Sequence, residues 1–232
     1  VVTIDASASS VDQSLTTGVS VSGSSIVLGG GGNDTIATSN VSDLVNGGLG
    51  NDAISTADGD DLIQLSDDFG NDTITGGEAG ETNGDTLDAS GLTTSGVNVD
   101  FSASEAGTVT DDTTGDVASF FEIENIITTD QDDVIDASAA IVGINVDAGD
   151  GADTITGGDG DDTIELGAAD EDNDVVVLTD DFGDDVLSGF ETPTVNPDGS
   201  LTSNDTFDVT GLTNTDGDPV TTDDVVVTDT NG

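Results

Sequence analysis

The feature that most constrains this chain is an internal period of nine residues. Residues 29–37 (GGGGNDTIA) and 47–55 (GGLGNDAIS) share a glycine-rich turn, an aspartate and an aliphatic residue two positions after it. Residues 38–46 (TSNVSDLVN) and 56–64 (TADGDDLIQ) keep the same frame, although the former retains only the aspartate and the aliphatic residue. Self-similarity at a fixed period indicates an array in which each unit stacks on the next.

The nine-residue unit returns further along the chain. It recurs at 67–75, loosely around Asp85 and Leu87, and then in a second block at 128–136, 148–156, 157–165, 169–177 and 180–188. A longer period lies over it, because residues 61–78 match residues 174–191 at an offset of 113. The chain therefore contains roughly two copies of a unit of about 120 residues, as array proteins do.

Each unit combines turn-forming and strand-forming residues. Glycines at positions 1, 2 and 4 permit positive φ, and the Thr-Ile-Xaa tail is suited to a short strand with its aliphatic side chain inward. Two units make one flattened coil, so residues 18 apart stack at about the 4.8 Å spacing of neighbouring strands. The sequence predicts an all-β fold, a parallel β-roll or β-solenoid, with two repeat blocks joined by short β-rich segments.

Charge is the second constraint. The chain has 50 Asp and Glu and no Lys, Arg or His, for a net charge of −50, and its hydrophobic content is 33%. Burial alone cannot offset the ordering entropy of such a chain. The predicted stacking places Asp34 above Asp52 and Asp43 above Asp61, and two carboxylates about 5 Å apart repel by roughly 1 kcal/mol in water.

A divalent cation between the stacked turns reverses this repulsion. Ca²⁺ accepts about six to eight oxygens from carboxylates and backbone carbonyls, whereas Zn²⁺ prefers His and Cys, which this chain lacks. We therefore expect several calcium ions and no other cofactor.

The composition also excludes partners and activities. Without a cationic side chain, the chain has no electrostatic means of binding nucleic acids or anionic membranes. No apolar run is long enough to span a bilayer, and neither a signal peptide nor a cysteine is present. The kinase-like triplets Asp68-Phe69-Gly70 and Asp181-Phe182-Gly183 stand in a chain without lysine, so we interpret them as repeat sequence with Phe as an apolar plug. We expect no catalytic residue.

The units resemble the G-G-x-G-x-D-x-U-x nonapeptides of hemolysin-type (RTX) calcium-binding proteins. The resemblance implies that the aspartates and turn carbonyls of successive coils bind Ca²⁺. The implied ligands are Asp34, Asp43, Asp52, Asp61, Asp72, Asp133, Asp153, Asp162, Asp174 and Asp185, with carbonyls from Gly30, Gly32, Gly48, Gly50, Gly158 and Gly160. The turns of Asp43 and Asp133 lack the glycines, and insertions before Asp72, Asp174 and Asp185 leave open which turns pair.

The resemblance also implies a function. We expect a calcium-binding structural module of a secreted or cell-surface bacterial protein, exported unfolded by type I secretion and folding when it meets calcium. Two alternatives stay open. One is a self-assembling surface-layer or filament subunit that associates through its coil ends, and the other is a non-catalytic C-terminal segment of an exported hydrolase or epimerase.

The organisation predicted along the chain has five parts. The alternation of Val97, Val99 and Phe101 predicts three or four strands in the middle segment. We expect its Phe and Ile side chains to pack in the core, and the alternative is that they close one roll and lead into the next. A strand is also expected at 225–227, and helices nowhere. The parts are 1–27, the β-rich end of a preceding unit; 28–91, repeat block 1; 92–127, a β-rich spacer; 128–192, repeat block 2; and 193–232, a β-rich acidic spacer.

Overall fold

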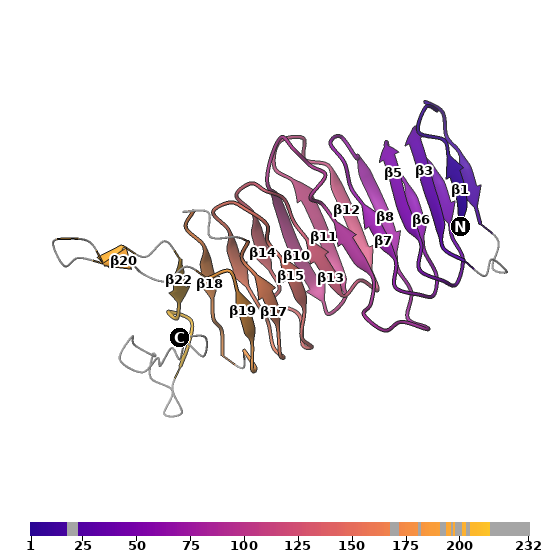
Figure 1. Cartoon of the computed structure of the whole chain (residues 1–232). Coiled ribbons are helices and arrows are strands. Elements are labelled where there is room, and N and C mark those ends of the chain that lie inside the picture. The colour runs from indigo at the N-terminus through magenta and orange to yellow at the C-terminus, as the bar shows by residue number, and fades with distance from the viewer. Residues whose placement is uncertain are drawn as a thin grey trace.

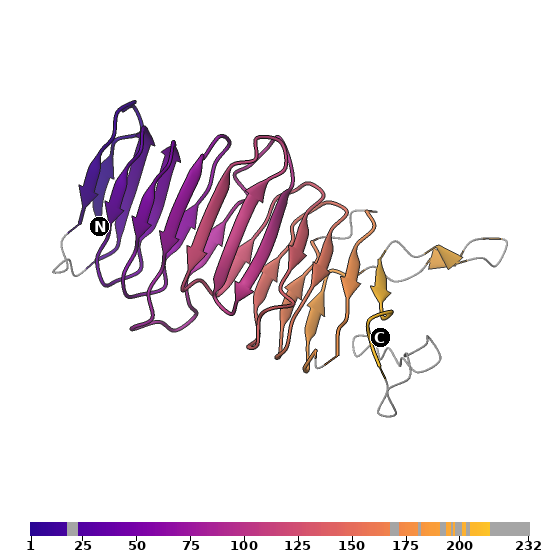
Figure 2. The ribbon, with the colours of Figure 1, turned by 180° about the vertical axis from the view of Figure 1, so that it is seen from behind.

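The computed structural model describes residues 1–17, 23–167, 172–180, 182–190, 194–195, 197, 201–202 and 205–213. Over these residues the regular structure is all β, as predicted, and no helix occurs. Figure 1 shows an elongated solenoid with the N-terminal strands at one end and β18, β19 and β22 at the other. The view from behind in Figure 2 shows the same stack of coils. In the described part of the chain there is accordingly no helix that could cross a membrane.

Two long sheets form the solenoid, and successive coils contribute to each in turn. The first sheet, called sheet A, contains nine strands among the described residues. In spatial order they are β1 (Val2–Asp5), β3 (Ser25–Gly31), β5 (Leu44–Leu49), β7 (Leu62–Gln64), β9 (Thr86–Asp88), β13 (Asn125–Ile127), β15 (Asn145–Asp147), β17 (Thr163–Glu165) and β19 (Val186–Ser188).

The second sheet, called sheet B, has eleven strands in the same described part. In spatial order they are β2 (Ser14–Thr16), β4 (Thr35–Ala37), β6 (Ala53–Ser55), β8 (Asn71–Thr75), β12 (Val117–Phe121), β11 (Ala106–Asp111), β10 (Val97–Ala103), β14 (Val134–Asp136), β16 (Thr154–Thr156), β18 (Val175–Val177) and β22 (Thr206–Asp208). A separate hairpin pairs β20 (Thr194–Val195) with β21 (Leu201–Thr202).

The core lies between the two sheets and consists of ladders of stacked aliphatic side chains. Ile36 pairs with Ile54 in sheet B, and Val45 pairs with Ile63 in sheet A, both across 18 residues. All four side chains are buried. Each such burial stabilises the fold by about 1.5–3 kcal/mol. The nine-residue period thus sets both the register of the sheets and the position of the core.

Insertions do not disturb the strand register, because the extra residues lie in the turns. Ile54 is followed in the ladder by Ile74, and Ile63 by Leu87, across 20 and 24 residues. The turn before β9, residues 76–85, is the longest of the first block. The structure therefore resolves the pairing that the sequence left open.

The segment 92–127 forms β10, β11, β12 and β13, in agreement with the three or four strands predicted. Strand β11 pairs antiparallel with β12 on one side and with β10 on the other, while β12 pairs parallel with β8 and β10 pairs parallel with β14. Sheet A meanwhile continues from β9 to β13. Phe101 and Phe120 are buried with their rings edge to face, 5.4 Å apart at 78°. These aromatic side chains fill the interior of one continuous solenoid.

The long period seen in the sequence has a structural counterpart. The backbone N–H of Thr93 donates to Asp67 Oδ1 at 2.9 Å, and the N–H of Thr213 donates to Asp180 Oδ1 at 2.7 Å. Both threonine hydroxyls also donate to the second oxygen of the same aspartates. The same threonine-to-aspartate contacts are therefore present in both copies of the long repeat.

The apolar role predicted for the Phe of the repeat triplets is confirmed at Phe69, which is buried in the core. Phe182 is half-buried. Asp181, the strand expected at 225–227 and most of the segment 193–232 lie outside the described residues.

Candidate metal centres

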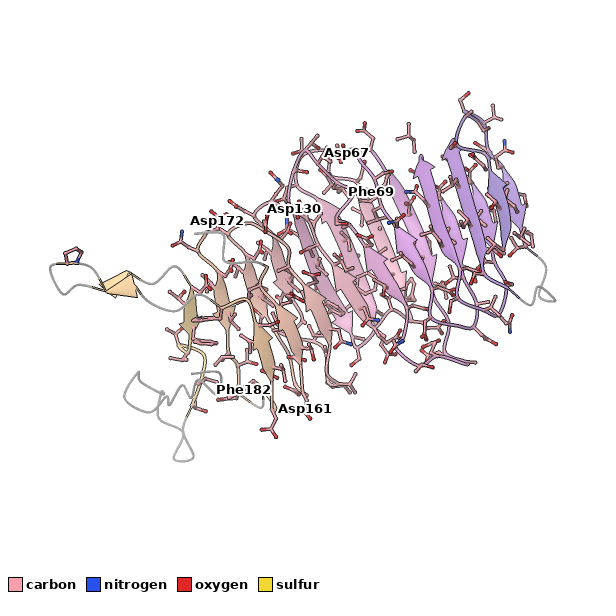
Figure 3. All side chains as sticks on the ribbon, viewed as in Figure 1. Asp67, Phe69, Asp130, Asp161, Asp172 and Phe182 are labelled. Carbon is pink, nitrogen blue, oxygen red and sulfur yellow. The ribbon has the colours of Figure 1, made fainter. Side chains whose placement is uncertain are left out.

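The turns of the solenoid form two rows, one along each long edge. We call the row that precedes the strands of sheet B the B edge, and the row that precedes the strands of sheet A the A edge. Figure 3 shows Asp67, Asp130 and Asp172 along the B edge, and Asp161 and Phe182 along the A edge. The predicted metal ligands lie in these two rows.

The repeat aspartates of the first block are linked from coil to coil through one carboxylate oxygen. On the B edge, the N–H of Asp34 donates to Asp52 Oδ1 at 2.7 Å, and the N–H of Asp52 donates to Asp72 Oδ1 at 2.8 Å. On the A edge, the N–H of Asp43 donates to Asp61 Oδ1 at 2.6 Å. The stacking expected of Asp34 on Asp52 and of Asp43 on Asp61 is thus confirmed.

The second block repeats this arrangement across its insertions. The N–H of Asp133 donates to Asp153 Oδ1 at 2.8 Å, and that of Asp153 donates to Asp174 Oδ1 at 2.9 Å. On the A edge the N–H of Asp162 donates to Asp185 Oδ1 at 3.0 Å. The structure therefore brings each of the ten predicted aspartates into one of the two rows.

The second carboxylate oxygen has a different environment. The Oδ2 atoms of five predicted aspartates are buried and have no hydrogen-bond partner among the described residues. Leaving a buried carboxylate oxygen unpaired costs several kcal/mol unless a cation or donor contacts it. These oxygens are therefore the atoms that fit a bound cation. They belong to Asp34, Asp52, Asp61, Asp153 and Asp162.

Glycine at the first position of the turn makes room for this oxygen. A Cβ placed on Gly29 would lie 2.6 Å from Asp34 Oδ2, closer than van der Waals contact allows. A Cβ on Gly47 would clash in the same way with Asp52 Oδ2. At Asp34 and Asp52 the carboxylate therefore folds back over the start of its own turn, against a glycine that has no Cβ.

The other turn glycines bring successive backbones close together. The predicted ligand carbonyls lie at glycines with φ between 99° and 122°, except at Gly158, whose φ is not positive. A Cβ on Gly48 would clash with the Gly30 carbonyl oxygen, so the carbonyl of one turn lies directly against the next. The predicted glycines with positive φ are Gly30, Gly32, Gly48, Gly50 and Gly160.

Asp43 and Asp133 differ from the other predicted ligands. Asp43 Oδ2 accepts hydrogen bonds from the N–H and hydroxyl of Ser39, at 3.0 and 3.1 Å. Asp133 Oδ2 accepts the same pair from Thr129, at 2.8 and 3.1 Å. Ser39 and Thr129 occupy the turn position that is glycine in the full repeats, so a hydroxyl satisfies the oxygen that stays unpaired elsewhere.

Several of the buried repeat aspartates have raised pKa values. Burial, and then the charge of neighbouring aspartates, raises the pKa of Asp61 and Asp153 to about 8 and the pKa of Asp72 to about 7. The same causes raise the pKa of Asp52 and Asp162 to about 6. Their charged forms are destabilised in the metal-free fold, and a divalent cation would reverse this.

Sequence reasoning missed three members of the two rows. Asp85 Oδ1 accepts the N–H of Asp61 at 2.8 Å, and Asp205 Oδ1 accepts the N–H of Asp174 at 3.2 Å. Glu124 Oε2 accepts the N–H of Asp85 at 2.6 Å. Asp85 and Asp205 are each followed by a threonine and an apolar residue. This part of the repeat pattern could have identified them as members of the rows. Glu124 carries neither the aspartate nor the glycines of the repeat.

Parallel coils with buried, unpaired carboxylate oxygens along both edges define a β-roll of the cation-binding class. Comparison with known protein families matches the RTX calcium-binding nonapeptide repeat in four copies, over residues 28–63, 64–79 and 145–176. Within these residues the chain therefore carries the RTX calcium-binding nonapeptide repeat.

The likeness to individual solved structures is weaker. No curated protein matches the sequence. Matching solved structures include the crystal structure of the extracellular lipase LipA from Serratia marcescens, at 20% identity and a TM-score of 0.32. That match covers 90% of this chain, which spans 40% of the length of the lipase chain.

Proposed function

We propose that this chain is a calcium-dependent structural module of a secreted or cell-surface protein, and that calcium folds and stiffens it. The observation that carries the proposal is the set of buried Oδ2 oxygens without a hydrogen-bond partner among the described residues. They recur at one position of the repeat, whereas Asp43 and Asp133, whose turns lack the glycines, have hydroxyl donors in the same place.

The residues that would hold the ions follow from the two rows. Carboxylates and glycine carbonyls give Ca²⁺ the oxygen ligands it prefers. We assign no ion to Asp43 and Asp133, whose oxygens are hydrogen-bonded. The proposed ligands are Asp34, Asp52, Asp61, Asp72, Asp85, Asp153, Asp162, Asp174, Asp185 and Asp205, with carbonyls from Gly30, Gly32, Gly48, Gly50, Gly158 and Gly160.

In this proposal the repeat blocks at 28–91 and 128–192 bind calcium, and 92–127 joins them rigidly. The parts at 1–27 and 193–232 flank them. The role of the module is mechanical, since it spaces or displays other parts of a secreted protein and performs no catalysis. Export in the unfolded state followed by folding in calcium-rich surroundings suits affinities of about 10⁻⁴–10⁻³ M, the range of extracellular calcium modules.

A calcium titration of chelator-treated protein tests the proposal. We expect the β-signal in circular dichroism to rise with Ca²⁺ and to respond far less to the same concentration of Mg²⁺, which prefers strict octahedral geometry and keeps its waters. A β-signal that does not change with calcium would refute the proposal.

Assembly through the coil ends is a second candidate. At one end of the described solenoid, β1 pairs with β3 alone and β2 pairs with β4 alone, so both present a strand edge. Open edges are sites where another chain can add. Light scattering at millimolar calcium decides, because an assembling subunit grows in mass and a spacer module stays monomeric.

A segment of an exported hydrolase or epimerase would have the same calcium chemistry, and the full-length gene identifies it.

A further inference from the structure

Asparagine is followed by glycine at Asn46-Gly47, at Asn83-Gly84 and at residues 231–232, which lie outside the described part of the chain. An Asn-Gly pair is prone to deamidation, because glycine has no Cβ to keep its backbone nitrogen away from the preceding side chain. The nitrogen attacks the asparagine Cγ, a C–N bond forms, and the amide leaves as ammonia with the proton of that nitrogen. Water then opens the resulting succinimide to aspartate or isoaspartate.

The two described pairs lie in different surroundings. Asn46 is half-buried in β5, where it pairs with Leu28 of β3, and Gly47 is buried. Asn83 is exposed in the turn before β9, and Gly84 has a φ of 80°. Sheet A therefore fixes the backbone of the first pair, whereas the second pair lies outside the strands.

The second pair is held by one carboxylate from the turn before β7. Asp60 Oδ1 accepts the N–H of Thr82 at 2.7 Å and the N–H of Asn83 at 3.2 Å, and Asp60 Oδ2 accepts an N–H of the Asn83 side-chain amide at 3.1 Å. After the backbone N–H groups of Thr82 and Asn83, that of Gly84 also lowers the pKa of Asp60. Asp60 thus engages both groups that have to react.

We propose that Asn83-Gly84 is a deamidation site that reacts in the calcium-free chain and that Asp60 protects in the folded chain. The reaction needs an Asn83 side chain that can rotate and a Gly84 nitrogen that can lose its proton. The contacts from Asp60 restrain both, and they form only when the turns before β7 and β9 stack. The inference rests on the proposed function in one respect, because calcium is the agent that brings these turns together.

Deamidation at this position would damage the A edge. A carboxylate at position 83 would face Asp60 Oδ2, and the chain has no Lys, Arg or His to neutralise the pair. Isoaspartate would also lengthen the backbone by a CH₂ group shortly before Asp85, whose Oδ1 accepts the N–H of Asp61. Asn83→Asp, which installs one of the two products, should therefore raise the calcium midpoint of folding.

The test follows deamidation of each asparagine in the full chain at mildly alkaline pH, in chelator and in saturating Ca²⁺. Peptide mapping by mass spectrometry measures the change in mass and the isoaspartate formed. The wild type is compared with Asp60→Ala and Asp60→Asn. Asp130→Ala is the matched control, because Asp130 is an exposed aspartate on the B edge (Figure 3). In every sample Asn46 reports whether sheet A has formed.

In chelator we expect Asn46 and Asn83 to react at similar rates in all variants, and we expect calcium to slow both in the wild type and the control. In Asp60→Ala with calcium, Asn83 alone should react about tenfold faster than in the control, since hydrogen bonds to a charged acceptor are lost. Asp60→Asn keeps an oxygen that can accept the N–H groups, so it should show an intermediate rate.

Equal Asn83 rates in Asp60→Ala and the control, with Asn46 protected in both, would overturn this inference and leave the proposed function standing. The same holds if calcium protects Asn46 of the wild type but does not slow Asn83. If Asp60→Ala fails to fold, its Asn46 reacts as well, and Asp60→Asn then decides, because an Asn83 rate equal to that of the control overturns the inference. Calcium that slows neither asparagine in the wild type would refute both proposals.

Discussion

The backbone N–H of Asp34 donates a 2.7 Å hydrogen bond to Oδ1 of Asp52, the aspartate at the same position one coil later. Asp52 Oδ2, in contrast, is buried without a hydrogen-bond partner in the described part of the chain. One side chain thus has two separate tasks. Its first oxygen joins neighbouring coils, and its second is available to an ion.

Replacing Asp52 by Asn should separate these tasks. The amide oxygen can still accept the N–H of Asp34, but the negative charge is lost. A hydrogen bond or ligand contact to a charged group contributes about 2 kcal/mol, so we expect the calcium midpoint of folding to rise roughly 30-fold. Circular dichroism during a calcium titration measures it.

Asp43→Asn is the matched comparison, because Ser39 already satisfies Asp43 Oδ2. We expect this variant to lose stability, since the new amide N–H₂ faces the donors of Ser39, but to bind as many ions as the wild type. A loss of calcium from Asp43→Asn would contradict the assignment of no ion to this turn.

Gly47→Ala should disturb the proposed ion site by steric clash alone. The φ of Gly47 is not positive, but the new Cβ would clash with Asp52 Oδ2. Such overpacking costs about 1–3 kcal/mol, and it also displaces the proposed ligand. Thermal unfolding at fixed calcium measures the loss of stability. Gly211→Ala is the control, since the nearest atom to its Cβ lies 3.5 Å away, and equal melting of both variants would argue against the close approach.

Acid should stabilise the metal-free fold. Burial raises the pKa of Asp61 and Asp153 to about 8, from an unfolded value near 3.8. Between these values the folded state binds more protons than the unfolded state, so the free energy of unfolding falls as pH rises from about 4 to 8. In chelator we therefore expect more β-signal at pH 5 than at pH 8.

With calcium the dependence on pH should reverse. The ion must displace these protons, so its affinity weakens as pH falls from 8 toward 6. Calcium titrations at pH 6, 7 and 8 measure this. A calcium midpoint independent of pH would mean that Asp61 and Asp153 are not ligands.

Ile63→Ala should lower stability without removing an ion. Ile63 is fully buried between Val45 and Leu87 in sheet A. Truncating such a side chain costs about 2–5 kcal/mol, whereas Val134→Ala, at a position that is 44% exposed, should cost far less. Urea unfolding in saturating calcium compares them. Equal effects of the two substitutions would place the core elsewhere.

The period of the sequence predicted the coil and its core, because Ile36 and Ile54 can stack only if two units close one turn. It did not predict the antiparallel pairing of β10, β11 and β12, since alternation indicates strands but not their direction. The pairing of Asp61 with Asp85 was hidden because the insertion between them lies in a turn, where extra residues leave the strand register unchanged.

The difference between turns that have the repeat glycines and turns that lack them was likewise only partly visible in the sequence. Missing glycines marked Asp43 and Asp133 as unusual, but the donors to their second carboxylate oxygens, Ser39 and Thr129, emerge only when the turn is folded. Glu124 could not be found by pattern, because its longer side chain reaches the row from a turn of another shape.

The hydrogen bonds that join the repeat aspartates run one way, from the backbone N–H of one aspartate to the carboxylate of the aspartate in the next coil. The array consequently has a head and a tail. A coil joining on the C-terminal side has to bring an acidic side chain, and one joining on the N-terminal side has to bring an N–H. Two such arrays can extend each other only head to tail, so any filament built on this contact would be polar.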